Sequence, residues 1–241
     1  MKANALAVAC MLQVAAAHYT FDSITVNGLP SAQYQFVLPN TRSEEYMPTK
    51  FINSFGVTPL DQDFRCNEGA FTNMGATDVA YIQAGDSVDF VLALGAKIVH
   101  PGPSQVYMSR APGSAKDYDG SGDWFKIYQE DLCGDTSDGI KDEDWCATAR
   151  DRVTITIPAT TPPGDYLIRA EHIGLHGAFQ GEAEFYYACA LVNINGPGGG
   201  IPGPLVKIPG VHQPDDPSVN FDIYNNPTSY SQAPGPEVWM G

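Results

Sequence analysis

The chain contains many short segments in which apolar and polar side chains alternate. The alternation is clearest at 19–26 (YTFDSITV) and 86–94 (DSVDFVLAL). Because successive side chains of a strand point to opposite faces of a sheet, this pattern predicts half-buried β-strands. Further strands are predicted at 34–38, 105–109, 125–128, 152–157, 165–170 and 183–194.

The predicted strands are rich in β-branched and aromatic residues and are bounded by Gly, Pro, Asn and Asp. No window sustains an apolar stripe of helical period beyond a turn or two. This spacing predicts an all-β protein, an antiparallel β-sandwich of the immunoglobulin or fibronectin type. The segments 51–77 and 111–123 are expected to form long loops.

The last part of the chain is rich in Gly and Pro. Residues 195–210 read NGPGGGIPGPLVKIPG, a composition that by itself would suit a linker to a second module. The residues that follow it, 211–241, are too few for a separate folded module without staples. We therefore interpret 195–241 as an extended C-terminal wrap, and 18–241 as one domain without a separate binding module.

The first seventeen residues, MKANALAVACMLQVAAA, have the features of a secretory signal peptide. An early lysine precedes an apolar run, and Ala15-Ala16-Ala17 supplies the small-residue cleavage site. The apolar run is shorter than the ~20 residues that a membrane-spanning helix needs. The sequence therefore predicts a secreted, extracellular protein whose mature chain begins at His18.

The number of cysteines is consistent with the predicted secretion. Cys10 leaves with the signal peptide, and an even set of four remains, which in a secreted chain is typical of two disulfides. Three connectivities are open. We favour Cys133–Cys146, which closes an acidic loop, and Cys66–Cys189, which joins distant segments. A zinc site is the competing interpretation, and the chain has no CxxC pair to support it.

The charge balance restricts the kind of partner. Asp and Glu number 28 against 13 Lys and Arg, for a formal net charge of −15. Duplex nucleic acids and anionic membrane surfaces both require a cationic face, so neither is expected as a partner. The expected partner is small, neutral or a neutral polymer, and the protein is expected to act as a monomer.

Two histidines have contexts that suit a metal site. Cleavage after Ala17 gives His18 a free α-amine beside its ring Nδ1, a pair that can chelate one ion if a second histidine lies nearby. His100 follows a predicted strand and precedes Pro101-Gly102-Pro103, which would hold it on a loop over a rigid scaffold. A solvent-exposed turn histidine would have the same sequence context.

A third region, RAEHIGLHGAFQGEAEFYYAC, contains His172 and His176. Their spacing is that of a helical zinc pair, but the context is a strand and no Glu follows His172, so a zinc-protease motif is excluded. On the returning strand Glu184 and Tyr186 share one face. They could form a hydrogen-bonded core pair as well as part of a site. The many acids leave paired-carboxylate glycosidase chemistry open.

Several of these pieces together resemble one family. They are an HYTF start directly after the signal site, VHPGP, DWFKIYQEDL, VTITIPATTPPGDYLIRAEHIGLH, AEFYYAC and a PGPEVW end. In this order they resemble the fungal copper-dependent lytic polysaccharide monooxygenases of auxiliary activity family nine. The resemblance spans essentially the whole mature chain.

The resemblance implies one copper ion per chain. Its ligands would be the amine and ring of His18, the ring of His100, and Tyr186 beneath the metal, since Tyr186 precedes Cys189 by the family's Y-x-x-C spacing. His176 would be the outer-sphere histidine, and Cys66–Cys189 the usual disulfide. Imidazole and amine nitrogens suit copper.

The implied activity is the oxidative cleavage of β-1,4-glucan, above all cellulose, at C1 or C4, with O2 or H2O2 and an external electron donor. The polymer would stack on flat aromatic side chains, for which Tyr230 is the first candidate, followed by Tyr19 and Tyr224. Buried core tyrosines are the alternative for all three. A non-catalytic secreted copper-binding protein with the same ligands and a hydrolytic glycosidase are the alternative functions.

One position departs from the family pattern. Glu184 stands where the family commonly has Gln. A carboxyl group can hydrogen-bond to a bound oxygen species only when it is protonated or bridged by water, and near copper it can be ionised instead. A pH-dependent activity to which Glu184 contributes is therefore expected.

Overall fold

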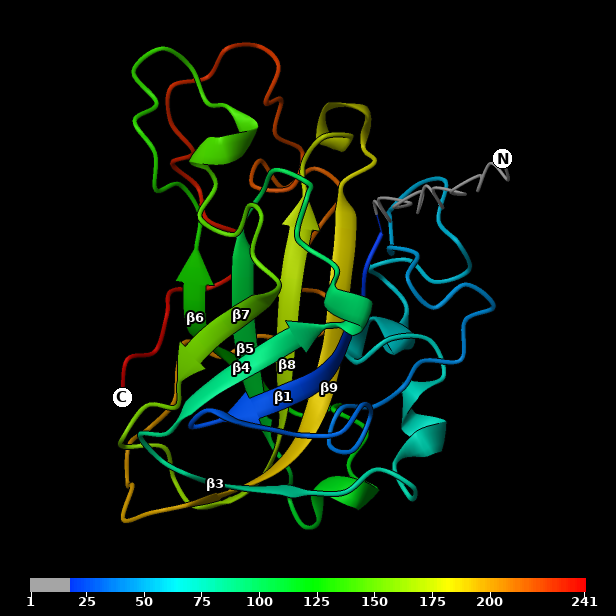
Figure 1. The fold of residues 1–241 in the computed structure, drawn as a ribbon, viewed down its shortest axis with the longest axis vertical. Helices are drawn as coiled ribbons and strands as arrows, with labels where there is room; N and C mark the ends of the chain where they lie inside the picture. Colours follow the sequence, from blue (N-terminus) through cyan, green and yellow to red (C-terminus); the bar gives the residue numbers. More distant parts are fainter. Residues whose placement is uncertain (1–17) are drawn as a thin grey trace, which may run out of the picture.

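The computed structural model describes residues 18–241, so the predicted signal peptide lies outside the described residues. Two β-sheets pack face to face (Figure 1). The first has the order β2-β1-β4-β7 and is antiparallel throughout. Its strands are β1 (Phe21–Val26), β2 (Leu29–Pro30), β4 (Ser87–Leu92) and β7 (Arg152–Thr156).

The second sheet has the order β3-β9-β8-β5-β6. Its strands are β3 (Ala80–Gln83), β5 (Ser104–Arg110), β6 (Trp124–Glu130), β8 (Gly164–Gly174) and β9 (Glu184–Asn195). Neighbouring strands are antiparallel except β3 and β9, which are parallel. The antiparallel prediction was wrong for that one pair.

Helical structure within residues 18–241 is limited to 3-10 turns of three or four residues. They are η1 (Gln62–Arg65), η2 (Ala70–Asn73), η3 (Ala93–Gly95), η4 (Ala115–Asp117), η5 (Asp142–Asp144) and η6 (Ala178–Gln180). The predicted all-β sandwich is therefore confirmed. None of these turns has the length and apolar character that a membrane-spanning helix needs.

Two strand predictions differ from the structure. Residues 34–38 form no strand and make only an isolated bridge between Val37 and Ala190, because Tyr34 turns the backbone to a φ of 54°. Strand β3 was missed, although it alternates as expected, with Ala80 and Ile82 buried while Tyr81 is exposed. A four-residue edge strand carries too short an alternation to stand out from its loops.

The central strands β8 and β9 are covered on both faces. Alternate side chains of β9, among them Tyr186 and Ala188, enter the core between the sheets. The others, among them Phe185 and Tyr187, pack under loop segments and the end of the chain on the outer face of the second sheet. Strand β9 therefore has a buried side chain at nearly every position.

Both predicted disulfides are confirmed. Cys66–Cys189 joins the long loop before β3 to β9, and Cys133–Cys146 closes a loop of sequence separation 13. Each has its Cα atoms 5.1 Å apart, within the usual range for a disulfide.

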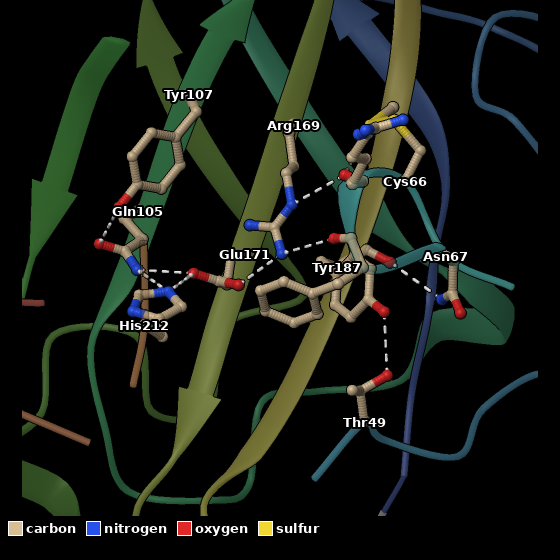
Figure 2. A network of polar contacts seen from close by, with 12 residues as sticks. Thr49, Cys66, Asn67, Gln105, Tyr107, Arg169, Glu171, Tyr187 and His212 are labelled. Carbon is tan, nitrogen blue, oxygen red and sulfur yellow. Dashed lines mark hydrogen bonds and ion pairs between the residues drawn. A yellow bond between two sulfur atoms is a disulfide. The ribbon is translucent and has the colours of Figure 1, made fainter. Parts of the chain in front are cut away.

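A polar network lies on the outer face of the second sheet (Figure 2). Arg169 and Glu171 of β8 form a fully buried ion pair of 2.6 Å, and His212 of the C-terminal segment approaches Glu171 at 2.9 Å. Further along, Val206 pairs with Trp124, and the Trp239 backbone N–H donates to the Lys126 carbonyl at 2.7 Å. The end of the chain thus binds the sheet at several separate points.

Candidate metal centre

The predicted metal ligands meet at one end of the sandwich, where β1 starts, β8 ends and β9 begins (Figure 1). His18 lies three residues before β1, and Tyr186 is the third residue of β9. His100 lies in the connection between η3 and β5. Three segments that are far apart in the sequence therefore supply one cluster.

The turn after His100 fixes that residue against the end of β8. The Ile173 N–H donates to the Pro103 carbonyl at 3.0 Å, and the Leu175 N–H donates to the Pro101 carbonyl at 2.8 Å. Gly102 has a φ of +151°, and a Cβ there would lie 1.8 Å from the Ile173 carbonyl oxygen. Only glycine fits this close backbone approach.

The rings of the cluster lie close together. The ring centroid of His100 is 6.1 Å from that of His18 and 5.8 Å from that of Tyr186, and the His18 and Tyr186 centroids are 6.3 Å apart. His176 stacks on His100 with centroids 4.2 Å apart and planes tilted by 21°. The structure thus brings all four predicted residues together.

Glu184 and Tyr186 do share one face of β9, as predicted. The Tyr186 hydroxyl donates to Glu184 Oε2 at 2.5 Å. The same oxygen lies 3.7 Å from His100 Nε2 and 3.6 Å from His176 Nε2. The carboxylate therefore faces the histidine rings directly.

Lys50 is a member of this cluster that the sequence analysis did not identify. Its Nζ lies 3.0 Å from Glu184 Oε1 and 3.4 Å from Glu182 Oε2. Burial alone would raise the pKa of the Glu184 carboxyl, but the hydrogen bonds from Tyr186 and Lys50 outweigh it and lower that pKa below its usual value. Glu184 is therefore ionised at neutral pH.

A second buried pair, Tyr19 and His172, packs against the cluster. The Tyr19 ring stacks on Tyr186 at 4.2 Å, and the Tyr19 hydroxyl is 2.7 Å from His172 Nδ1. Desolvation lowers the pKa of the fully buried His172 to about 3, so the ring is neutral. Because Tyr19 is only 1% exposed, its prediction as a substrate-binding residue is wrong.

The other two predicted substrate-binding tyrosines differ from each other. Tyr230 is 8% exposed, packs against Trp145 and Phe221, and donates its hydroxyl to the Ser218 carbonyl at 2.6 Å. It is a core residue, so that prediction is also wrong. Tyr224 is 65% exposed and remains available to a ligand.

Phe179 is an exposed aromatic residue that the sequence analysis passed over. It lies in η6, three residues after His176, and its ring meets that of Tyr224 edge to face at 5.7 Å. An aromatic residue between two glycines, in the segment GAFQG, was the available signal. Two exposed aromatic rings are therefore in contact, one of them in the turn that follows His176.

The residues present fit a copper ion. Side-chain ligand atoms of His100, His176 and Glu184 lie within 4.8 Å of one another, and the His18 ring stands beside them. Imidazole-rich sets of this kind bind copper, zinc and iron, and copper has the highest affinity of the divalent first-row metals. A carboxylate at the edge of the set adds negative charge that favours a cation.

Comparison with known proteins identifies the family. Residues 18–232 match the model of Auxiliary Activity family 9 (formerly GH61). The chain is 51% identical to AA9 family lytic polysaccharide monooxygenase D of Aspergillus tamarii, over all of this chain and 87% of that protein. It is 50% identical to AA9 family lytic polysaccharide monooxygenase A of Aspergillus fumigatus, over all of this chain and 83% of that protein.

A solved structure agrees with this assignment. The fold is similar to that of a cellulose-active polysaccharide monooxygenase from M. thermophila, with a TM-score of 0.76 and 28% identity over 93% of this chain and all of the other. The chain therefore belongs to auxiliary activity family 9, the copper-dependent lytic polysaccharide monooxygenases.

Proposed function

We propose that this chain is a secreted monooxygenase that cleaves the β-1,4-glycosidic bonds of cellulose by oxidation at C1 or C4. Copper would be held by the amine and ring of His18, the ring of His100 and the hydroxyl of Tyr186. When bound, copper supplies the redox chemistry through which O2 or H2O2 and an external electron donor act on the sugar.

The exposed aromatic pair is the observation that supports a glucan substrate. Tyr224 and Phe179 are 65% and 45% exposed and contact each other, and Phe179 lies in η6, three residues after His176. Aromatic faces can stack on the apolar faces of sugar rings without any charge on the ligand. The structural relative that is itself described as cellulose-active supports cellulose among the neutral glucans.

The chain's own groups would manage protons at the site. The Tyr186 hydroxyl donates a hydrogen bond of 2.5 Å to the Glu184 carboxylate. His176, 3.6 Å from that carboxylate and partly exposed, can take up or release a proton toward the open side. In this role His176 and Glu184 act as a pair beside His100, while His18, His100 and Tyr186 are the proposed copper ligands.

Mass spectrometry of the products tests this function. The chain starting at His18 is loaded with Cu(II) and incubated with cellulose in the presence and absence of ascorbate. We expect oxidised cello-oligosaccharides that require both copper and reductant and that disappear in His100→Ala. Tight copper binding without oxidised products would indicate a non-catalytic copper protein, and unoxidised sugars without reductant would indicate a glycosidase.

Secretion has a separate test. Amino-terminal sequencing of protein from the culture medium should find His18 as the first residue. Any other mature terminus would remove the α-amine from the proposed copper ligands.

A further inference from the structure

The backbone places Lys50 opposite Glu184. Thr49 and Phe185 form an antiparallel bridge, in which the Thr49 N–H donates to the Phe185 carbonyl at 3.0 Å and the Phe185 N–H donates to the Thr49 carbonyl at 2.9 Å. Lys50 follows Thr49 and Glu184 precedes Phe185, so these two residues lie opposite each other across the antiparallel bridge. The lysine is therefore directed toward the carboxylate by main-chain pairing.

Thr49 is itself held in place from the outer face of the sheet. Its hydroxyl lies 2.9 Å from the Tyr187 hydroxyl and accepts a hydrogen bond of 2.6 Å from Arg42 (Figure 2 shows Thr49 and Tyr187). All three side chains are buried. The bridge that carries Lys50 therefore belongs to the rigid part of the fold.

The two oxygens of Glu184 have separate partners. Oε1 is 3.0 Å from Lys50 Nζ, whereas Oε2 accepts from Tyr186 and faces His100 and His176. The side chains of Lys50 and Glu184 are only 13% and 5% exposed. Water therefore solvates this ion pair poorly, so the loss of either charge leaves the other without its nearest counter-charge.

Without Lys50 the carboxylate would have a different preferred partner. Its Oε2 is 3.7 Å from His100 Nε2, so this oxygen already lies beside a ring that would hold the copper ion. A buried carboxylate that loses its counter-charge is destabilised unless another positive charge compensates it, and a cation held by His100 would supply that charge. The remaining hydrogen bond, from Tyr186, is neutral.

We propose that Lys50 is a positioning residue that holds the Glu184 carboxylate beside the copper ligands and prevents it from becoming a ligand itself. This inference rests on the copper site of the proposed function. In this inference Lys50 determines which side chains bind the copper ion, while Glu184 and His176 keep their proposed role in proton transfer.

The second partner of Lys50 offers a matched control. Glu182 Oε2 is 3.4 Å from Lys50, and Glu182 Oε1 accepts from Asn53 Nδ2 at 2.6 Å. Glu182→Gln therefore removes a negative charge from the same lysine without touching the carboxylate that faces the histidines. Lys50→Arg keeps the positive charge and provides the conservative rescue.

The first measurement is the electron paramagnetic resonance spectrum of the Cu(II)-loaded protein. We expect Lys50→Met to shift the g and copper hyperfine values, because an oxygen ligand is gained. Lys50→Arg and Glu182→Gln should keep the wild-type spectrum. In the Glu184→Gln background, Lys50→Met should cause no further shift, since no carboxylate is left to move.

The second measurement is the thermal unfolding of the copper-free protein. Lys50→Met should lower the Tm by roughly 5–10 °C, as expected when one partner of a mostly buried ion pair is removed. Lys50→Met/Glu184→Gln should lose clearly less than the sum of the two single variants.

The outcomes separate the two proposals. An unchanged copper spectrum in Lys50→Met, or the same shift in both backgrounds, overturns the role of Lys50 while leaving the copper site intact. A wild-type chain that takes up no Cu(II) with nitrogen ligands overturns the copper site, and the role of Lys50 with it. Additive Tm losses in the copper-free protein would show that the pair is not coupled and would also overturn the inference.

Discussion

The buried ion pair on the outer face of the second sheet supports a quantitative prediction for Glu171→Gln. Glu171 Oε2 accepts from Arg169 at 2.6 Å, and Oε1 accepts from Gln105 at 2.6 Å and lies 2.9 Å from His212 Nε2. Arg169, Glu171 and Gln105 are fully buried, and His212 is 1% exposed. The substitution keeps the size of the side chain, removes its charge and replaces one of its two acceptor oxygens by an NH2 donor.

The variant leaves the Arg169 guanidinium without a counter-charge. The cation would retain the rings of Phe64 and Tyr187, 4.7 and 4.5 Å away, and two backbone carbonyls. Removing one partner of a buried ion pair costs about 3–5 kcal/mol. For a domain of this size that is a fall in Tm of roughly 6–20 °C.

The loss of stability in Glu171→Gln relative to the wild type should be smaller at low pH than at neutral pH. Burial alone would raise the pKa of the Glu171 carboxyl, but Arg169 and His212 outweigh it and hold the pKa far below its usual range. A depressed pKa in the folded state stabilises the fold above the unfolded-state pKa of about 4.3, and this stability is lost as the pH falls below that value. The wild type should therefore lose its advantage over the variant in acid.

Thermal unfolding at pH 7 and at pH 3 measures both effects. Asp123→Asn is the matched control, because Asp123 pairs with Lys207 at 2.9 Å with both side chains more than half exposed. That pair should contribute less than about 1 kcal/mol. Equal Tm values for Glu171→Gln and wild type at pH 7, or equal losses in Glu171→Gln and Asp123→Asn, would refute the reasoning.

Three further substitutions test the assignments of individual residues. Tyr224→Ala should weaken adsorption to cellulose in a pull-down assay while the Cu(II) spectrum stays as in the wild type, because the exposed ring packs on Phe179 and is not among the proposed ligands; unchanged adsorption would contradict its role. Tyr230→Phe should lower the free energy of unfolding by about 1–3 kcal/mol in chemical denaturation, because the buried Ser218 carbonyl loses its hydrogen-bond donor. Weaker adsorption to cellulose with unchanged stability would instead show that Tyr230 is a substrate-binding residue. Cys133→Ala/Cys146→Ala should lower the free energy of unfolding by about 3 kcal/mol under non-reducing conditions, because the unfolded chain is no longer constrained by this short closed loop. A variant as stable as the wild type would show that the other contacts of the loop are sufficient to hold it.

The local alternation of apolar and polar residues was sufficient to predict most of the fold. A period of two in apolar residues depends only on the neighbouring positions of a strand, so β1, β4 and β9 could be recognised from the sequence. The same rule placed Glu184 and Tyr186 on one face. Strand β3 and the irregular stretch 34–38 were mistaken because short or bent segments carry too little of that signal.

Burial of single aromatic residues could not be read in the same way. Tyr19 and Tyr224 were both predicted as substrate-binding residues, yet one is stacked on Tyr186 and the other is exposed. The difference depends on which distant segment covers each ring. Tyr230 is buried because Trp145 and Phe221 reach it from two different loops.

The sequence by itself determined the class of fold, the even set of four cysteines and the candidate ligands His18 and His100, because each rests on composition, spacing or a local turn. It left three cysteine pairings open, and the structure settled them as Cys66–Cys189 and Cys133–Cys146. Only the tertiary structure decided that Lys50 meets Glu184 and that His212 meets Glu171. Those pairs are separated along the chain, and each exists because strand pairing and loop packing set a register that no local pattern encodes. The charges around the metal centre are therefore a property of the folded chain.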